Sequence, residues 1–173
     1  GFHPSLRPSV SEAAGLRAVF AALLVWALTP GMAGALSDAA AKDMEKAMEL
    51  RVAKKYDEAA AILRGLAGRS AADPETRSEA LYQQGLTLQE SGRLAEALDL
   101  FDSVVREYPG QPSAPYAQLA WSLGQARSGP SDKAMAGLDV LMARYPRFGA
   151  AGLLAMGDLQ EQAVKGNLQV PGQ

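Results

Sequence analysis

The most informative segment of this chain runs from Leu81 to Pro109, with the sequence LYQQGLTLQESGRLAEALDLFDSVVREYP. Two helices that pack antiparallel need small residues where their backbones approach most closely. Gly85 and Ala97, on either side of a polar turn, can provide that contact. Phe101 follows Ala97 by one helical turn, so both side chains face the same neighbour. Pro109 ends the second helix because proline lacks the backbone N–H group. The segment therefore predicts a helix pair.

The spacing of these residues resembles that of a tetratricopeptide repeat. The pattern of that family is W-x2-L-G-x2-Y, then A-x3-F, then P, within about 34 residues. Its Gly, Ala, Phe and Pro correspond to Gly85, Ala97, Phe101 and Pro109. Its Trp, Leu and Tyr are replaced by Leu81, Gln84 and Leu88. The resemblance implies a stack of such helix pairs that binds other proteins.

Similar units flank this segment on both sides. Ala97 lies 38 residues after Ala59 and 37 residues before Ala134. The pair Tyr145-Pro146 likewise follows Tyr108-Pro109 by 37 residues. We therefore predict that the helices are packed together by Ala59, Gly85, Ala97, Phe101, Pro109, Ala134, Leu138 and Pro146.

The predicted fold is all-α, an α-α superhelix of about three helix pairs with a C-terminal capping helix. The repeats are expected at residues 40–73, 74–112 and 113–148, the capping helix at 149–165 and a disordered tail at 166–173. The composition agrees with this, because the chain is 48% hydrophobic but only 6% aromatic. Such a composition suits packed helices better than a β-sandwich.

The first 35 residues have the three parts of a secretory signal peptide. Arg17 supplies a positive flank, residues 18–28 form an apolar run, and Ala33-Gly34-Ala35 is a small-residue cleavage site. The alternatives are an uncleaved membrane anchor, for which a helix needs about 20 mostly apolar residues, and a buried core helix. We expect cleavage after Ala35 and export to the periplasm or beyond a bacterial cell.

The long repeat periods and the sequence of residues 101–115 make the chain similar to the bacterial envelope subset of tetratricopeptide proteins. That subset includes the cell-division coordinator of the Tol–Pal system and the lipoprotein of the outer-membrane assembly machinery. This chain lacks the coiled coil of the former and the lipidated cysteine of the latter. The resemblance implies a compartment, the cell envelope, and no particular pathway.

The residue types argue against an enzyme. There is no cysteine, and the one histidine, His3, lies in the predicted signal peptide. Nucleophilic catalysis through Cys or His is then unavailable, and a zinc site would depend on carboxylates alone. Glu96, Asp99 and Asp102 lie along one helix, where a solvated face is the favoured interpretation over an acid–base site. We expect no cofactor and no metal.

A binding groove is predicted along the first helix of each pair, as the family resemblance implies. Its exposed residues would be Met44, Met48, Arg51, Tyr82, Leu86, Gln89, Tyr116, Leu119 and Leu123. Exposed apolar surface usually marks a partner site, and Met and Tyr suit adaptable contacts. The alternative is that the leucines and tyrosines belong to the core within each repeat.

The sequence thus predicts an exported scaffold that binds a protein or peptide in the envelope, in envelope assembly or cell division. The net charge of −2 and the lack of a basic stripe argue against nucleic acid. A membrane is a partner only if the N-terminal segment is retained. The alternatives are a structural subunit that self-associates through its repeat ends and an envelope enzyme with a carboxylate site.

Overall fold

The computed structural model describes residues 38–69, 73–128 and 131–167, and no β-strand occurs among them. The helices are α2 (Asp38–Val52), α3 (Tyr56–Arg69), α4 (Pro74–Glu90), α5 (Leu94–Glu107), α6 (Ala114–Ser128), α7 (Ser131–Arg144) and α8 (Gly149–Asn167), with the 3-10 turn η1 (Pro146–Phe148) before α8. The prediction of an all-α fold is confirmed.

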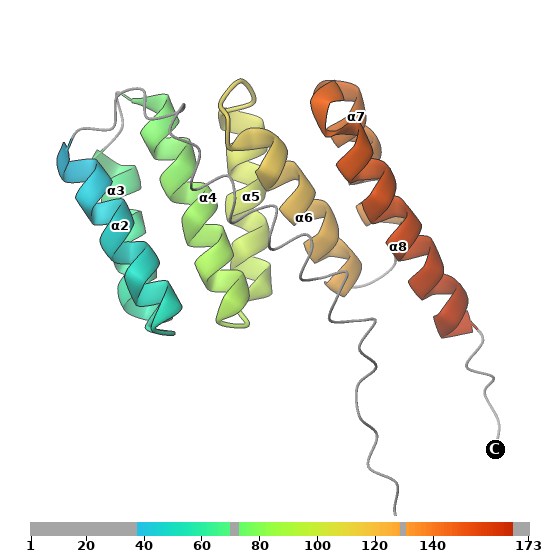
Figure 1. Ribbon diagram of the computed structural model, residues 1–173, viewed down its shortest axis with the longest axis horizontal. Helices are drawn as coiled ribbons and strands as arrows, with labels where there is room; N and C mark the ends of the chain where they lie inside the picture. Colours follow the sequence, from blue (N-terminus) through green and yellow to red (C-terminus); the bar gives the residue numbers. More distant parts are fainter. Residues whose placement is uncertain (1–37, 70–72, 129–130, 168–173) are drawn as a thin grey trace, which may run out of the picture. The chain divides into compact units, whose positions relative to one another are not determined.

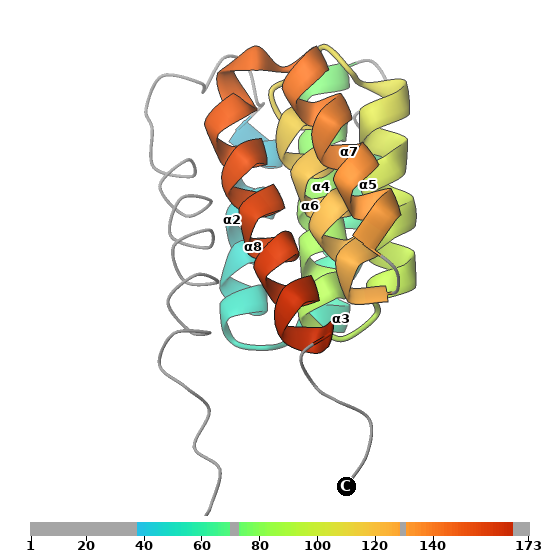
Figure 2. The same cartoon turned by 90° about the vertical axis from the view of Figure 1, so that its right-hand side faces the viewer.

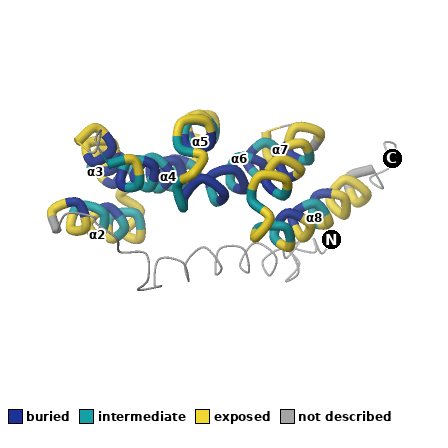
Figure 3. The backbone as a smooth tube through the Cα atoms, turned by 90° about the horizontal axis from the view of Figure 1, so that it is seen from above, coloured by how far each residue is buried: buried dark blue, intermediate teal, exposed yellow. Residues whose placement is uncertain are grey.

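Each helix packs against the next one along the chain, so that α2–α3, α4–α5 and α6–α7 form three helix pairs and α8 follows them (Figure 1). We call α2, α4 and α6 the A helices and α3, α5 and α7 the B helices. Figure 3 shows the B helices on one side of the array and α2 and α8 on the other, with α4 and α6 between them. The helix α2 also contacts α4, and α6 also contacts α8. Figure 2 shows α7 and α8 side by side at the end of the array.

The boundaries of the second pair follow from local chemistry. Asp73 is the N-cap of α4, and its carboxylate accepts hydrogen bonds from the backbone N–H groups of Glu75 (3.1 Å) and Thr76 (3.3 Å). Pro74 occupies the first turn, where no N–H group is needed. Between α4 and α5, Gly92 adopts a φ of 86°, a conformation that glycine enters at little cost.

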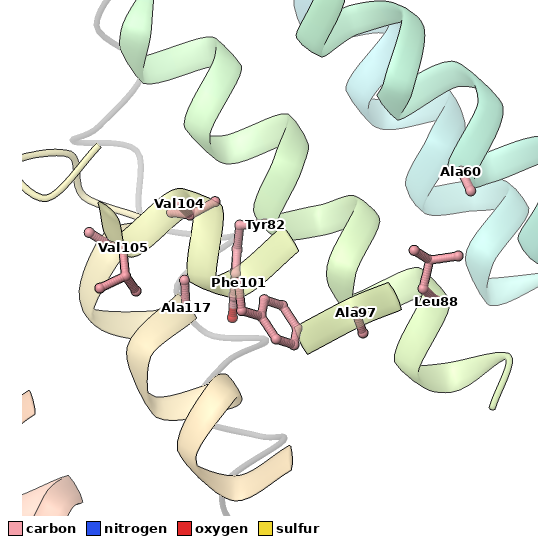
Figure 4. Close-up of a cluster of buried hydrophobic side chains, with 9 residues drawn as sticks. Ala60, Tyr82, Leu88, Ala97, Phe101, Val104, Val105 and Ala117 are labelled. Atoms are coloured by element: carbon pink, nitrogen blue, oxygen red, sulfur yellow. The ribbon is translucent and has the colours of Figure 1, made fainter. Parts of the chain in front are cut away.

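The second pair contains the first of two buried clusters. Phe101, Ala97 and Val104 of α5 are fully buried, and they pack with Tyr82 and Leu88 of α4. Figure 4 shows the ring of Phe101 between the two helices of the pair. Val105 of α5, Ala60 from α3, and Ala114 and Ala117 from α6 complete the cluster, which therefore joins neighbouring pairs.

The second cluster lies between the third pair and α8. Leu119 of α6, the fully buried Ala134, Leu138 and Leu141 of α7, and Ala155 and Leu159 of α8 form it. Between the second and third pairs, the hydroxyl of Tyr145 donates to the carbonyl oxygen of Pro109 at 3.0 Å. The array is thus held by contacts of each pair with the next.

The residues predicted to pack the helices together differ in how deeply they are buried. Ala59, Ala97, Phe101, Ala134 and Leu138 are fully buried, and Gly85 is buried too. Pro109 and Pro146 are exposed and follow the ends of α5 and α7. The prolines therefore end helices without contributing to the core.

Several sequence expectations concern residues that the structure does not describe. The predicted signal peptide, residues 1–35, lies outside the described residues, as does most of the predicted tail. None of the helices in the described ranges is long and apolar enough to cross a membrane.

Candidate functional site

The described A helices present a band of half-buried side chains, which we call the A-helix face. It consists of Met48, Arg51, Glu79, Gln83, Leu86, Tyr116 and Leu123. Five of these residues were predicted from the sequence as groove positions, and Met44 and Gln89, also predicted, are half-buried as well. Leu86 and Tyr116 pack partly against the first core cluster, and Leu123 packs partly against the second.

Two of the predicted groove residues are not exposed. Tyr82 is only 2% exposed and Leu119 only 8%, so each belongs to a core cluster instead. They are equivalent positions, because 37 residues separate them. The helix α4 packs against α3 and α5 and also contacts α2. Tyr82, which was predicted to face outward from α4, lies beside the rings of Phe101 and Tyr116 instead. Exposure at this position was therefore wrongly predicted in both repeats.

A polar network joins α2 to α4 on the A-helix face. Arg51 Nη1 donates to Gln83 Oε1 at 2.8 Å, and Arg51 Nε lies 3.7 Å from Glu90 Oε2. Gln83 Nε2 in turn donates to Glu79 Oε1 at 2.7 Å. The amide of Gln83 thus links a guanidinium group on one side to a carboxylate on the other.

The carboxyl group of Glu79 on this face has a strongly raised pKa. Burial raises the pKa of its carboxyl to about 7, and the negative charge of Glu75 adds to this effect. The hydrogen bond from Gln83 and the charge of Arg51 oppose it without cancelling it. Burial also raises the pKa of Glu90, again against the charge of Arg51. Such shifted groups are candidates for functional sites.

Aromatic rings continue the face from α4 to η1. The ring centroids of Tyr82 and Tyr116 are 6.3 Å apart, and Tyr116 meets Phe148 edge-on at 4.9 Å. Burial raises the pKa of the Tyr116 hydroxyl, and the charge of Glu79 acts in the same direction. The charge of Glu79 thus acts on the hydroxyls of both tyrosines.

Glu79 and Gln83 were not among the predicted groove residues, although the sequence contains a signal for Glu79. Subtracting the 37-residue period from Tyr116 gives Glu79, and subtracting it from Leu123 gives Leu86. The groove residues predicted for the second repeat began at Tyr82 and so omitted the position of Glu79.

Apolar surface is also exposed on α8. Leu153 is 64% exposed, Leu154 60% and Val164 58%. The opposite side of the helix, with Ala155 and Leu159, packs on α7. The exposed side of α8 is therefore unoccupied by any described residue.

A shallow hollow lies between α5 and α7. It is lined by Asp102, Val105, Gln118, Trp121, Lys133, Ala136, Gly137 and Val140. Trp121 is half-buried there, packing partly against the first core cluster, and a Cβ atom on Gly137 would lie 2.9 Å from its ring. The tryptophan therefore fills space between helices. Within the described ranges, no group of three or more His, Cys, Asp or Glu side chains could hold a metal ion.

Comparison with known proteins agrees with the helix pairs. Residues 79–110, which cover most of α4 and all of α5, match the family model described as tetratricopeptide repeat. A search of curated proteins and a search of solved structures find no match to the chain. The matched repeat and the all-helical stack support a protein–protein interaction scaffold, a fold that is typically non-enzymatic.

Proposed function

We propose that this chain is an exported scaffold of the bacterial cell envelope that captures a protein or peptide on its A-helix face. The observation that supports this most is the tetratricopeptide match over residues 79–110, because α4, the A helix of that repeat, carries Glu79, Gln83 and Leu86 at the centre of the face. The apolar members of the face, such as Leu86 and Leu123, offer contact area, and its polar members offer specificity. We assign the protein no catalytic role and no nucleic-acid partner.

Export rests on the signal-peptide pattern of residues 1–35, which the structure does not describe. The resemblance to envelope proteins favours a partner in envelope assembly or cell division. Fractionation of cells that produce the full chain tests the compartment. Recovery of the protein in the periplasm, shortened at Ala35, is expected, and recovery only in the cytoplasm would contradict export.

Site-specific photo-crosslinking in the native envelope tests the capture face. A photoreactive amino acid at Leu86 or Leu123 should yield one shared partner, identified by mass spectrometry. The same probe at Ala61 and Ala95, exposed positions on B helices, is the matched control and should not yield it. Equal yields from both sets would exclude the A-helix face as the capture surface.

Self-association through the end of the array is the second candidate. The exposed Leu153, Leu154 and Val164 of α8 favour it, because adjacent exposed leucines usually mark a contact surface. Light scattering of the full chain and of the Leu153→Asp/Leu154→Asp double variant tests it. A concentration-dependent dimer that the double variant abolishes would support this candidate. A monomer at all concentrations would exclude it.

A further inference from the structure

The hollow between α5 and α7 lies on a different side of the array from the A-helix face. Gln118 and Trp121 of α6 line the hollow, whereas Tyr116 and Leu123 of the same helix belong to the A-helix face. A step of two residues along an α-helix turns by about 200°. Gln118 therefore lies opposite Tyr116, and Trp121 lies opposite Leu123. Figure 3 shows α5 and α7 on the same side of the array, so the hollow is a second, separate surface.

The hollow has an apolar lining that is held in place by the helices around it. Trp121 is half-buried, and Val140 on the wall formed by α7 is 46% exposed. Gln118 is only 5% exposed, and its Nε2 donates to the carbonyl oxygen of Gly137 at 3.1 Å, which ties α6 to α7. A surface that is already ordered loses little conformational freedom when a partner binds.

The repeat architecture does not require an apolar wall at this place. Three residues of α7 that line the hollow have polar counterparts on α5, one period earlier in the chain. Subtracting 37 from Lys133, Ala136 and Val140 gives Glu96, Asp99 and Ser103. Two carboxylates and a hydroxyl on α5 thus correspond to a lysine and two apolar side chains on α7. The apolar wall is therefore particular to this pair of helices, and exposed apolar surface usually marks a partner site.

The charges at the hollow favour an acidic partner. Asp102, on the wall formed by α5, already has a counter-charge, because its Oδ2 lies 3.1 Å from Nε of Arg106. Lys133, on the wall formed by α7, is exposed and forms no ion pair with a described residue. A basic group would meet the positive charges of Lys133 and Arg106 here. An acidic group would meet a lysine that has no counter-charge, and such complementarity selects partners.

We propose that this hollow docks a segment of a partner protein in which a large apolar side chain lies within a few residues of Asp or Glu. The apolar side chain enters the hollow beside Trp121, and the carboxylate meets Lys133. The hollow measures about 280 Å³, below the about 300–1,000 Å³ of sites that enclose a small molecule, so it suits a side chain better than a cofactor. This docking site is additional to capture on the A-helix face and does not depend on it.

The test uses the full chain with Trp26→Phe, so that Trp121 is its only tryptophan. A phage-displayed library of random 12-residue peptides is depleted on the Val140→Asp variant and then selected on the chain without that change. The selected peptides should share a large apolar residue with Asp or Glu close by. The best peptide, made without tryptophan, should change the fluorescence of Trp121 on binding.

Substitutions in the peptide measure the two parts of the contact. Alanine in place of the apolar residue should weaken binding about tenfold or more, because a buried apolar side chain is lost. Replacing the acidic residue by its amide should weaken binding about two- to fivefold, the range of an exposed ion pair.

Variants of the protein assign these effects to the hollow. Lys133→Gln should bind the acidic peptide and its amide analogue equally. Lys46→Gln, which removes the same charge from an exposed position on α2, should keep the two- to fivefold difference. Val164→Asp, at an exposed valine on α8, is the matched control for Val140→Asp and should bind the peptide normally. Circular dichroism confirms that each variant is folded.

Four outcomes would overturn the proposal. They are the absence of any peptide that distinguishes Val140→Asp, an acidic preference that is missing or that Lys133→Gln keeps, and binding that Leu86→Asp with Leu123→Asp abolishes. The fourth is a concentration-dependent dimer in light scattering that Val140→Asp dissociates, because a second copy would then occupy the hollow. Crosslinking from Leu86 or Leu123 tests the A-helix face separately, so the failure of one surface is distinguishable from the failure of the other.

Discussion

The ring of Phe101 packs directly on the backbone of α4 at Gly85. A Cβ atom added to Gly85 would lie 2.5 Å from Cε1 and 2.9 Å from Cδ1 of that ring. Both distances are shorter than carbon atoms tolerate, and Phe101 is fully buried, so the ring has little space to move. The glycine is therefore required by the close approach of the two helices of the pair.

Gly85→Ala should destabilise the protein by about 1–3 kcal/mol, the usual cost of overpacking a core. Alanine is more favourable than glycine inside a helix by about 1 kcal/mol. The free-energy cost of the clash must therefore exceed this gain. Gly65→Ala on α3 is the matched control, because nothing lies within 4 Å of the position where its Cβ would be. It should be neutral or stabilising. Urea denaturation measures the free energy of unfolding of both variants. Equal changes in the two variants would contradict the close packing of Phe101 on Gly85.

Much of the fold was predictable because the second pair carries a strong local pattern. In α5, the buried Ala97, Phe101 and Val104 recur at helical spacing along one side, so sequence periodicity is informative. The helix α4 has no such pattern, since buried residues such as Thr76, Tyr82 and Gly85 are distributed around it. A helix with neighbours on several sides does not reveal its outward face by periodicity. The two face residues that were not predicted, Glu79 and Gln83, both lie on this helix.

The hydroxyl of Tyr82 should lower the stability of the protein. It is buried without a hydrogen-bond partner among the described residues, so Tyr82→Phe should raise the free energy of unfolding by about 1 kcal/mol. Tyr145→Phe is the matched control, because that hydroxyl donates to Pro109 at 3.0 Å. This variant should lose about 0.5–1.5 kcal/mol, the value of an ordinary hydrogen bond. Thermal unfolding of both variants measures the difference, and losses of equal size would mean that Tyr82 has a partner.

Asp73 should stabilise the start of α4 only while its carboxyl is ionised. Hydrogen bonding by the Thr76 hydroxyl lowers the pKa of Asp73, with smaller contributions from the backbone N–H groups of Thr76 and Glu75. Asp73→Ala should cost about 0.5–2 kcal/mol near neutral pH. Because the folded pKa is lowered, the cost should diminish as pH falls below about 4. Asp139→Ala, an exposed change within α7, should be neutral or slightly stabilising by helix propensity. A cost for Asp73→Ala that is independent of pH would contradict the cap.

Glu79 should give the opposite pH dependence. Burial raises its pKa to about 7, whereas an unfolded chain releases this proton near pH 4.3. The folded state thus binds a proton that the unfolded state has lost, and this contribution to stability is complete below about pH 4 and disappears as pH rises through 7. The free energy of unfolding of the wild type, measured relative to Glu79→Gln, should therefore decrease by about 1–3 kcal/mol between pH 4 and pH 8. Glu90, whose pKa is also raised, is present in both proteins, so its effect cancels in the difference. Urea denaturation at four pH values measures the difference, and a value that stays constant would mean that water reaches the Glu79 carboxyl freely.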